Sequence, residues 1–231
     1  VGSEMCIRDR LGVMPVLLLI LFVWKKMYQT PIVGTVFIIL IFLCNLAYAF
    51  LARWYAVLHS GVKGERRLFR TVKKLHGTNI VFHNLPVRYK RGRSELDMLI
   101  VCHAGVLIIE VKNHSGTISG SWRDDKWTQR KHYRDGKVTE TMMDNPIKQM
   151  RRQRDIVKSI LTAAGENVWI DSVLYFSSPN AKLKISLRES DYVCCESAEL
   201  LEFLKSYDSG ETLSKSRMEH IAQILRESSG V

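Results

Sequence analysis

The sequence lacks the short motifs of several enzyme classes and contains little cysteine. Its five cysteines have no C-x-x-C spacing, which argues against a disulfide scaffold or a zinc ribbon and is typical of a reducing compartment. No H-E-x-x-H, G-x-S-x-G or P-loop motif is present, so the corresponding metalloproteases, serine hydrolases and nucleotide hydrolases are not indicated. Internal repeats are absent, and 46% hydrophobic with 25% charged residues excludes global disorder and collagen-like structure.

Charge is absent from one long stretch near the N-terminus. Residues 31–52 (PIVGTVFIILIFLCNLAYAFLA) contain no charged side chain, and as a helix they would span about 33 Å, close to the thickness of the hydrocarbon core. Trp54 and Tyr55 follow, as expected for interfacial aromatic residues. A buried helix of a soluble core is the alternative, but such a helix normally carries a polar stripe. The stretch therefore predicts a transmembrane helix.

A shorter apolar run at residues 11–24 precedes this helix. Its length is compatible with a short first span, a re-entrant segment or a signal h-region, although no small-x-small cleavage site follows. The link KKMYQT is too short for a domain, so the two runs predict a helical hairpin, with a membrane anchor over residues 11–55. Residues 1–10 (VGSEMCIRDR) resemble translated sequencing adapter, and we expect them to be a non-native leader.

The basic residues around the spans predict the orientation. The link has two lysines, whereas seven basic residues follow the second span: Arg53, Lys63, Arg66, Arg67, Arg70, Lys73 and Lys74. We therefore expect an integral protein of the bacterial inner membrane, in contact with the lipid bilayer through its N-terminal spans and with its soluble region in the cytoplasm.

The soluble region is itself divided by charge. Residues 61–158 contain 22 Lys and Arg against 10 Asp and Glu, a net charge of +12, whereas residues 159–231 contain 7 against 11, a net charge of −4. A strongly basic block indicates an anionic partner, either nucleic acid or the inner face of a membrane. Because only the first basic cluster (RRLFR) lies next to the predicted span, nucleic acid is favoured for the others.

Periodicity and turn residues predict an α/β fold with a mixed sheet. Helices are expected from residue 61 to Gly77, at 145–164, 197–205 and 214–228; strands are expected at 80–89, 95–102, 106–113, 116–122, 126–133, 168–176 and 191–195. Asn145 and Pro146 form a helix start, with Asn as the N-cap and Pro in the first helical position. His103-Ala104-Gly105 indicates a hairpin between the second and third strands.

This hairpin determines where two carboxylates lie. Side chains alternate along a strand, so Asp97 shares a face with Leu99 and Val101, and Glu110 shares a face with Ile108 and Lys112. If the turn leaves two residues unpaired, Asp97 lies opposite Glu110; an odd number without a bulge would send the two carboxylates to opposite faces. Opposed carboxylates suit Mg²⁺ or Mn²⁺, with the Val111 carbonyl as a further ligand and Lys112 beside the phosphate.

A less specific interpretation applies to each of these residues. The tripeptide E-x-K is common, and Asp, Glu and Lys on neighbouring strands form ordinary surface ion pairs. Glu65, on the apolar face of the helix after Gly61, has a simple role in the first helical turn, where a carboxylate favours the helix dipole. An apolar run (MLIV) follows Asp97, however, and another (VLII) precedes Glu110, so each charge lies at the end of a buried strand.

The order of these motifs resembles the PD-(D/E)xK nuclease superfamily and, within it, the nuclease-related domain, NERD. The resemblance covers roughly Gly61–Leu161 and rests on GERRL with Glu65, SELDMLIV with Asp97, GVLIIEVKNHSGTI with Glu110 and Lys112, Trp122 and Trp127, and NPIKQ with Gln149. One departure is Leu96-Asp97 where the superfamily name has Pro-Asp.

This resemblance implies a restriction-endonuclease-like mixed β-sheet core flanked by helices, which would follow the transmembrane helical hairpin expected from the two apolar runs. It implies a NERD core at 61–165, completed by strands and helices at 166–231. It also implies Mg²⁺-dependent (or Mn²⁺-dependent) hydrolysis of phosphodiester bonds. Asp97, Glu110 and the Val111 carbonyl would bind the metal, Lys112 would position water or stabilise the transition state, Glu65 would support the metal shell, and Gln149 would point into the site.

Three functional hypotheses follow. The first is a membrane-anchored cytoplasmic endonuclease that acts on DNA rather than RNA. The second is a non-catalytic module that binds nucleic acid at the membrane. The third is a scaffolding membrane protein whose basic face binds lipid headgroups, an interaction that depends on anionic lipid.

Overall fold

The computed structural model describes residues 31–75 and 77–229, and it separates into two compact units, 1–58 and 59–231. The predicted leader at 1–10 and the first apolar run at 11–24 lie outside the described residues, and with them half of the predicted hairpin. In the described part of the first unit the chain is entirely helical, and this helix, α2 (Pro31–Val72), continues into the second unit.

The sequence predicted a span ending at residue 52 and a separate helix from residue 61; that division is wrong, because α2 is continuous. The joining residues 53–60 contain no Pro or Gly, so nothing in them interrupts helical hydrogen bonding. Within the described residues, α2 is the one helix long and apolar enough to cross a membrane. Its window Thr35–Ala52 has a mean hydropathy of 2.4 and no buried residue.

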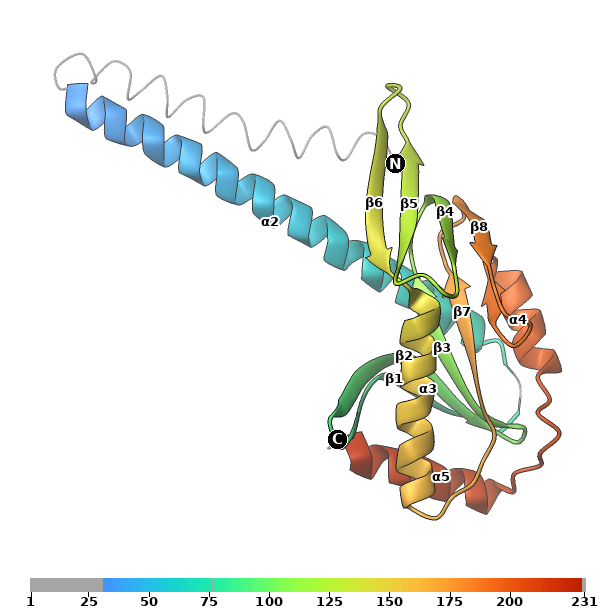
Figure 1. Ribbon diagram of the computed structural model, residues 1–231. Coiled ribbons are helices and arrows are strands. Elements are labelled where there is room, and N and C mark those ends of the chain that lie inside the picture. Colours follow the sequence, from blue (N-terminus) through green and yellow to red (C-terminus); the bar gives the residue numbers. More distant parts are fainter. Residues whose placement is uncertain (1–30, 76, 230–231) are drawn as a thin grey trace. The chain divides into compact units, whose positions relative to one another are not determined.

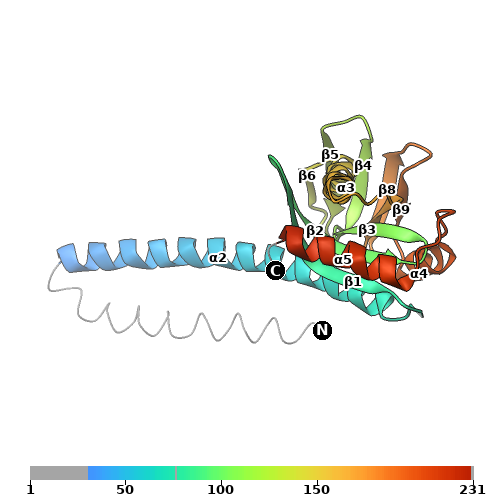
Figure 2. The same ribbon diagram turned by 90° about the horizontal axis from the view of Figure 1, so that it is seen from below.

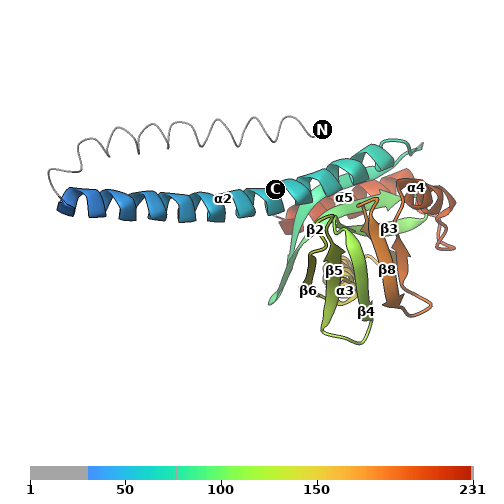
Figure 3. The same cartoon turned by 90° about the horizontal axis from the view of Figure 1, so that it is seen from above.

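The second unit contains two β-sheets, not the single mixed sheet that was predicted (Figure 1). Its remaining elements are β1 (Ile80–Tyr89), β2 (Gly92–Cys102), β3 (Gly105–Lys112), β4 (Gly116–Ser121), β5 (Lys126–His132), β6 (Val138–Asp144), α3 (Pro146–Ala163), β7 (Ile170–Phe176), β8 (Ala181–Ser186), β9 (Tyr192–Cys194), α4 (Ser197–Ser206) and α5 (Lys215–Ser229). The larger sheet has the order β1-β2-β3-β7-β9, and the smaller has the order β6-β5-β4-β8, which Figure 3 shows from above.

Both sheets are mixed. In the larger sheet β1, β2 and β3 are antiparallel, whereas β7 joins β3 in parallel and β9 joins β7 in parallel. In the smaller sheet β4 pairs with β5 in antiparallel and with β8 in parallel orientation. Parallel neighbours need long crossover connections, and the chain supplies them through the smaller sheet and α3.

Helices cover both faces of the larger sheet. On one face Leu99 and Ile108 pack in a core with Ile160 of α3 and Ile221 of α5. On the other face Leu107 packs in a second core that includes residues from the last turns of α2 and from α4. Figure 2 looks along α3 and shows it beside the strands of both sheets. This helix therefore links the larger sheet to the smaller one.

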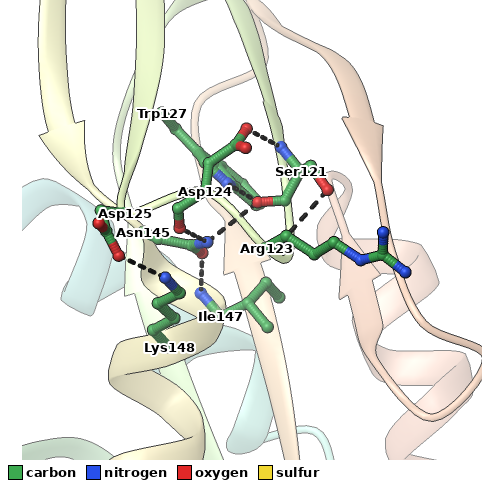
Figure 4. Close-up of polar contacts among 8 residues, drawn as sticks. All are labelled: Ser121, Arg123, Asp124, Asp125, Trp127, Asn145, Ile147 and Lys148. Atoms are coloured by element: carbon green, nitrogen blue, oxygen red, sulfur yellow. Dashed lines mark hydrogen bonds and ion pairs between the residues drawn. The ribbon is translucent and has the colours of Figure 1, made fainter.

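The start of α3 is held by the smaller sheet (Figure 4). As predicted, Asn145 is the N-cap: its side-chain oxygen accepts a hydrogen bond of 2.9 Å from the amide of Ile147. Its side-chain nitrogen donates to the carbonyl oxygens of Ser121, at 3.0 Å, and Asp124, at 2.7 Å. The buried Trp127 ring donates to the same Ser121 carbonyl at 2.9 Å. The β4–β5 turn thus fixes where α3 begins.

Most of the predicted elements are present with shifted ends. The β1 strand has the predicted limits, and β2 begins three residues earlier than expected. The strands β6 and β8 were missed. The α4 helix begins at Ser197, as predicted, and its N-cap position is Glu196. The Glu199 side chain accepts a hydrogen bond of 2.9 Å from the amide of Cys195.

Candidate active site

The β2–β3 turn sets the geometry of the site. Cys102 pairs with Gly105, which leaves two residues in the turn, and pairing continues to Met98 opposite Ile109. One step further, the same register places Asp97 opposite Glu110, so the register predicted from a two-residue turn is confirmed. Gly105 has φ +124°, and a Cβ atom there would lie 2.8 Å from the carbonyl oxygen of Trp169. Glycine is therefore required at this end of the turn.

Regular pairing of β2 is interrupted at Asp97 on both sides: the ladder with β3 ends just before it, and the ladder with β1 skips it and then resumes. In β1 the opposed residue is Asn84, which has a left-handed φ of 47° and is skipped by the β1–β2 ladder. Towards β3, the Asp97 side chain accepts a hydrogen bond of 2.7 Å from the amide of Val111. A carboxylate oxygen thus replaces a backbone acceptor where β2 leaves β3. Beyond this point β3 pairs only with β7 in the larger sheet, through Glu110, Val111 and Lys112.

The surroundings of Asp97 favour its protonated form. Burial, followed by the nearby charge of Glu110, raises the pKa of Asp97 to about 7, against the opposing effects of the Val111 amide and the Lys112 ammonium. Two carboxyl groups that share a partly desolvated site cannot both ionise readily. Such a perturbed pair indicates a functional site in a position where a cation would relieve the repulsion.

Glu110 is buried and fully engaged. Only 1% of the residue is exposed to solvent. One carboxylate oxygen accepts from the Lys112 Nζ at 2.5 Å, and the other accepts from the Gln153 Nε2 at 2.7 Å. The Lys112 amine also donates to the Gln149 Oε1 at 3.0 Å. The structure therefore brings together four of the five side chains predicted to act in the site, three from the β2–β3 hairpin and one from α3.

Gln153 is the polar partner that the sequence analysis did not include in the site. It is fully buried, and besides Glu110 it donates to the backbone carbonyl of Glu95 at 3.1 Å. Its Oε1 is the one buried side-chain oxygen or nitrogen without a hydrogen-bond partner among the described residues. The available signal was its position four residues after Gln149, on the helix face that also carries Ile156 and Ile160.

Glu65 lies at the margin of this group. Its carboxylate accepts a hydrogen bond of 3.4 Å from the Asn84 side chain, the residue opposite Asp97. It contributes the smallest of the effects that raise the pKa of Asp97. No hydrogen bond joins Glu65 to Glu110 or Lys112 in the described part of the chain. Its charge therefore reaches the site without direct contact.

The oxygen atoms of this site suit a hard divalent cation. Among the described residues no three His, Cys, Asp or Glu side chains gather closely enough to hold a metal by themselves. An ion here would have the carboxylates of Asp97 and Glu110 and would complete its shell with a main-chain carbonyl, water and phosphate, as Mg²⁺ commonly does. The unpartnered Gln153 oxygen adds an acceptor for a bound water. The residues present fit such an ion.

The comparison with protein families agrees with this arrangement. Residues 60–177 match the nuclease-related domain, NERD, over 118 of the 231 residues. The chain belongs to the NERD family. All six predicted site residues and Gln153 lie inside the matched region. The NERD match ends just after β7, yet Ile185 of β8 and Ile221 of α5 pack into the same cores as the matched strands.

Individual relatives add little about activity. An uncharacterized protein of Bacillus anthracis is 34% identical over 71 residues, which make up 30% of this chain and 34% of that protein. The chain thus aligns with about a third of the length of this relative. No solved structure matches the chain significantly.

Proposed function

We propose that this NERD protein is a membrane-anchored, metal-dependent endonuclease that hydrolyses phosphodiester bonds of DNA in the cytoplasm. The observation that carries the proposal is the convergence of Asp97, Glu110, Lys112 and Gln149 at the point where β2 and β3 part. Membership of the NERD family supports a nuclease-related function.

Each residue of the site would have a distinct role. Asp97 and Glu110, with the Val111 carbonyl, would hold Mg²⁺ or Mn²⁺, which polarises phosphate and makes water more acidic when bound. Lys112 would place a positive charge beside the scissile phosphate and orient water, while Gln149 would hold its amine in position. Gln153 would fix the Glu110 carboxylate, and Glu65 would tune the charge near Asp97.

In the reaction, water forms a new bond to phosphorus and the bond to one ester oxygen breaks. Water loses one proton, and the leaving oxygen gains one. The buried hydrogen bonds from Lys112 and Gln153 keep Glu110 in place during this exchange, so little reorganisation is needed.

A second candidate function is supported by the same contacts. Both Glu110 oxygens already accept hydrogen bonds, and the Lys112 charge is compensated by Glu110 at 2.5 Å. A site neutralised in this way would suit a NERD module that binds nucleic acid without cutting it. The net charge of +12 over residues 61–158 serves this function equally well.

Plasmid nicking separates the two functions. The full chain, purified in a mild detergent, is incubated with supercoiled plasmid in Mg²⁺, Mn²⁺ or EDTA. We expect nicking with either metal, and a loss of roughly hundredfold or more in Asp97→Asn and Lys112→Met, because each removes a group needed at the phosphate. Glu140→Gln and Lys184→Met, exposed residues of β6 and β8, are the matched controls and should cut normally.

Two results would contradict the proposal. Equal nicking by the wild type and both site variants would indicate a contaminating nuclease or a different site. DNA binding without cleavage under either metal would support the non-catalytic module instead.

A further inference from the structure

A basic groove lies between the β1–β2 turn and α3. It has a volume of about 600 Å³ and is lined by Lys90 and Arg91 from the turn and by Lys148, Arg151 and Arg152 from α3. Asp155 is its one acidic lining residue. The walls pack closely at the base, where a Cβ on Gly92 would lie 3.3 Å from the Ile156 side chain. The groove is thus part of the folded second unit.

The groove adjoins the candidate active site through two shared elements. On α3, Lys148 and Arg152 immediately precede Gln149 and Gln153, the two glutamines that contact Lys112 and Glu110. On β2, the carbonyl of Glu95 accepts from Gln153 only three residues after Gly92. The candidate site and the groove thus lie on the same two elements, α3 and β2.

Three of the five cations have no acidic partner. Within the described residues, Lys90, Arg91 and Arg152 form no ion pair. Arg151 is held by Asp191, with both oxygens at 2.7 Å, and Lys148 contacts Asp125, whose side chain is 95% exposed. The unpaired charges are thus available to an external anion.

We propose that this groove binds the sugar–phosphate backbone of the DNA strand that is cut, an inference that rests on the proposed nuclease function and gives it a substrate-binding site. The charge of the groove complements a polyanion, and its cations are spread over two elements rather than gathered for a single phosphate. Backbone contacts of this kind position a strand without reading its sequence. We therefore expect cleavage with little sequence preference.

The test measures binding separately from cutting. Anisotropy of a fluorescein-labelled DNA gives the Kd of the full chain in detergent, in EDTA, between 50 and 200 mM salt. The triple variant Lys90→Ala, Arg91→Ala and Arg152→Ala should bind about tenfold or more weakly, and its slope of log K against log salt should be smaller by about 2 to 3, because three phosphate contacts are lost. The charge-keeping variant Arg91→Lys with Arg152→Lys should retain the slope.

A control variant removes the same number of charges elsewhere. Lys184→Ala, Lys205→Ala and Lys215→Ala lie on β8, α4 and α5, outside the groove, and should leave the slope unchanged. An equal loss in both triple variants would show only a general charge effect and would overturn the inference. Unchanged DNA binding in the groove variant would also overturn it, as for a groove that serves anionic lipid headgroups.

The proposed function can fail independently. If the wild type binds DNA through the groove but cuts nothing with Mg²⁺ or Mn²⁺, the nuclease proposal fails and the groove assignment stands. If the wild type cuts and the groove variant binds normally, the groove assignment fails and the nuclease proposal stands.

Discussion

At the residue scale, the surroundings of Asp97 act on its pKa in two opposite directions. The Val111 amide, at 2.7 Å, stabilises a carboxylate, whereas burial and Glu110 disfavour one, and the second effect prevails. A carboxyl with a pKa of about 7 is about half protonated at neutral pH, and in the proposed function a bound cation would displace its proton. Titration of the Asp97 carboxyl group should therefore report on the electrostatics of the site.

The stability of the metal-free protein should fall as pH rises through this titration. The pKa of Asp97 is 3.8 unfolded and about 7 folded, so between these values the folded protein binds more protons than the unfolded chain. The free energy of unfolding then decreases with pH by about 1.4 kcal/mol per pH unit at most. Melting temperatures of the full chain in EDTA from pH 5 to pH 8 measure this, and Asp97→Asn should flatten the curve.

A matched variant and a metal titration sharpen the result. Asp155→Asn, an exposed residue of α3, should keep the wild-type pH dependence. Added Mg²⁺ should raise the melting temperature more at pH 8 than at pH 5, because the ion requires deprotonated ligands. A wild-type slope retained in Asp97→Asn would mean that another group titrates.

At the scale of elements, the hairpin shows what a sequence can predict. Two apolar runs joined by His103-Ala104-Gly105 left only the parity of the turn undecided, and parity alone determined whether Asp97 and Glu110 share a face. The start of α3 was predictable in the same way, because the two neighbouring residues Asn145 and Pro146 are by themselves a typical helix start. Features set by neighbouring residues were therefore predictable.

Features set by distant pairing were not predictable. The β6 strand (VTETMMD) is exposed along most of its length and has no apolar alternation. The β8 strand is stabilised by β4, with Gly116 opposite Ala181 across 65 positions of sequence. No local pattern encodes that contact, so the division into two sheets was missed. Gln153 was missed for a related reason, because its partner Glu110 lies on another element.

The N-cap of α3 provides a test at this scale. Asn145→Ala removes the acceptor for Ile147 and the donor to the carbonyls of Ser121 and Asp124 (Figure 4). The Ser121 carbonyl keeps the Trp127 ring as a donor, whereas the Asp124 carbonyl loses its bond from Asn145. Loss of a cap costs about 1 kcal/mol, and loss of the partly buried hydrogen bonds to the turn costs about 1 kcal/mol more. Urea denaturation of the full chain, followed by tryptophan fluorescence, should show that the free energy of unfolding falls by about 2 kcal/mol.

A second substitution at Asn145 divides this loss into its parts. Asn145→Ser keeps an acceptor for Ile147 but cannot donate to both carbonyls, so it should recover only the cap contribution. Full recovery with Ser would show that the bonds to the β4–β5 turn contribute nothing to stability.

At the scale of the whole molecule, membrane attachment depends on a single described element. The window Thr35–Ala52 has the length and hydropathy of a span, and its apolar side chains are exposed. A signal sequence that is cleaved off has the same composition. Attachment therefore has to be tested by the cell fraction that contains the chain and by the length of the chain found there. The excess of basic residues after the span predicts that the NERD unit lies in the cytoplasm.

Two pairs of lysine substitutions on the same helix distinguish a span from an exposed apolar surface. Ile39→Lys with Phe42→Lys places charges within the window, at about 2.5–3.5 kcal/mol each near the bilayer centre, and should release the chain from membranes washed with alkaline carbonate. Val62→Lys with Phe69→Lys changes equally apolar exposed residues beyond the window and should leave the chain in the membrane.

Size and a fusion reporter complete this test. The wild type should stay full-length in the membrane fraction, and a C-terminal green fluorescent protein should fluoresce, as it does only when it folds in the cytoplasm. A chain shortened near residue 52 would identify the window as a cleaved signal. A fluorescent but fully soluble wild type would remove the anchor from the proposal, and the proposed nuclease would then act without attachment to a membrane.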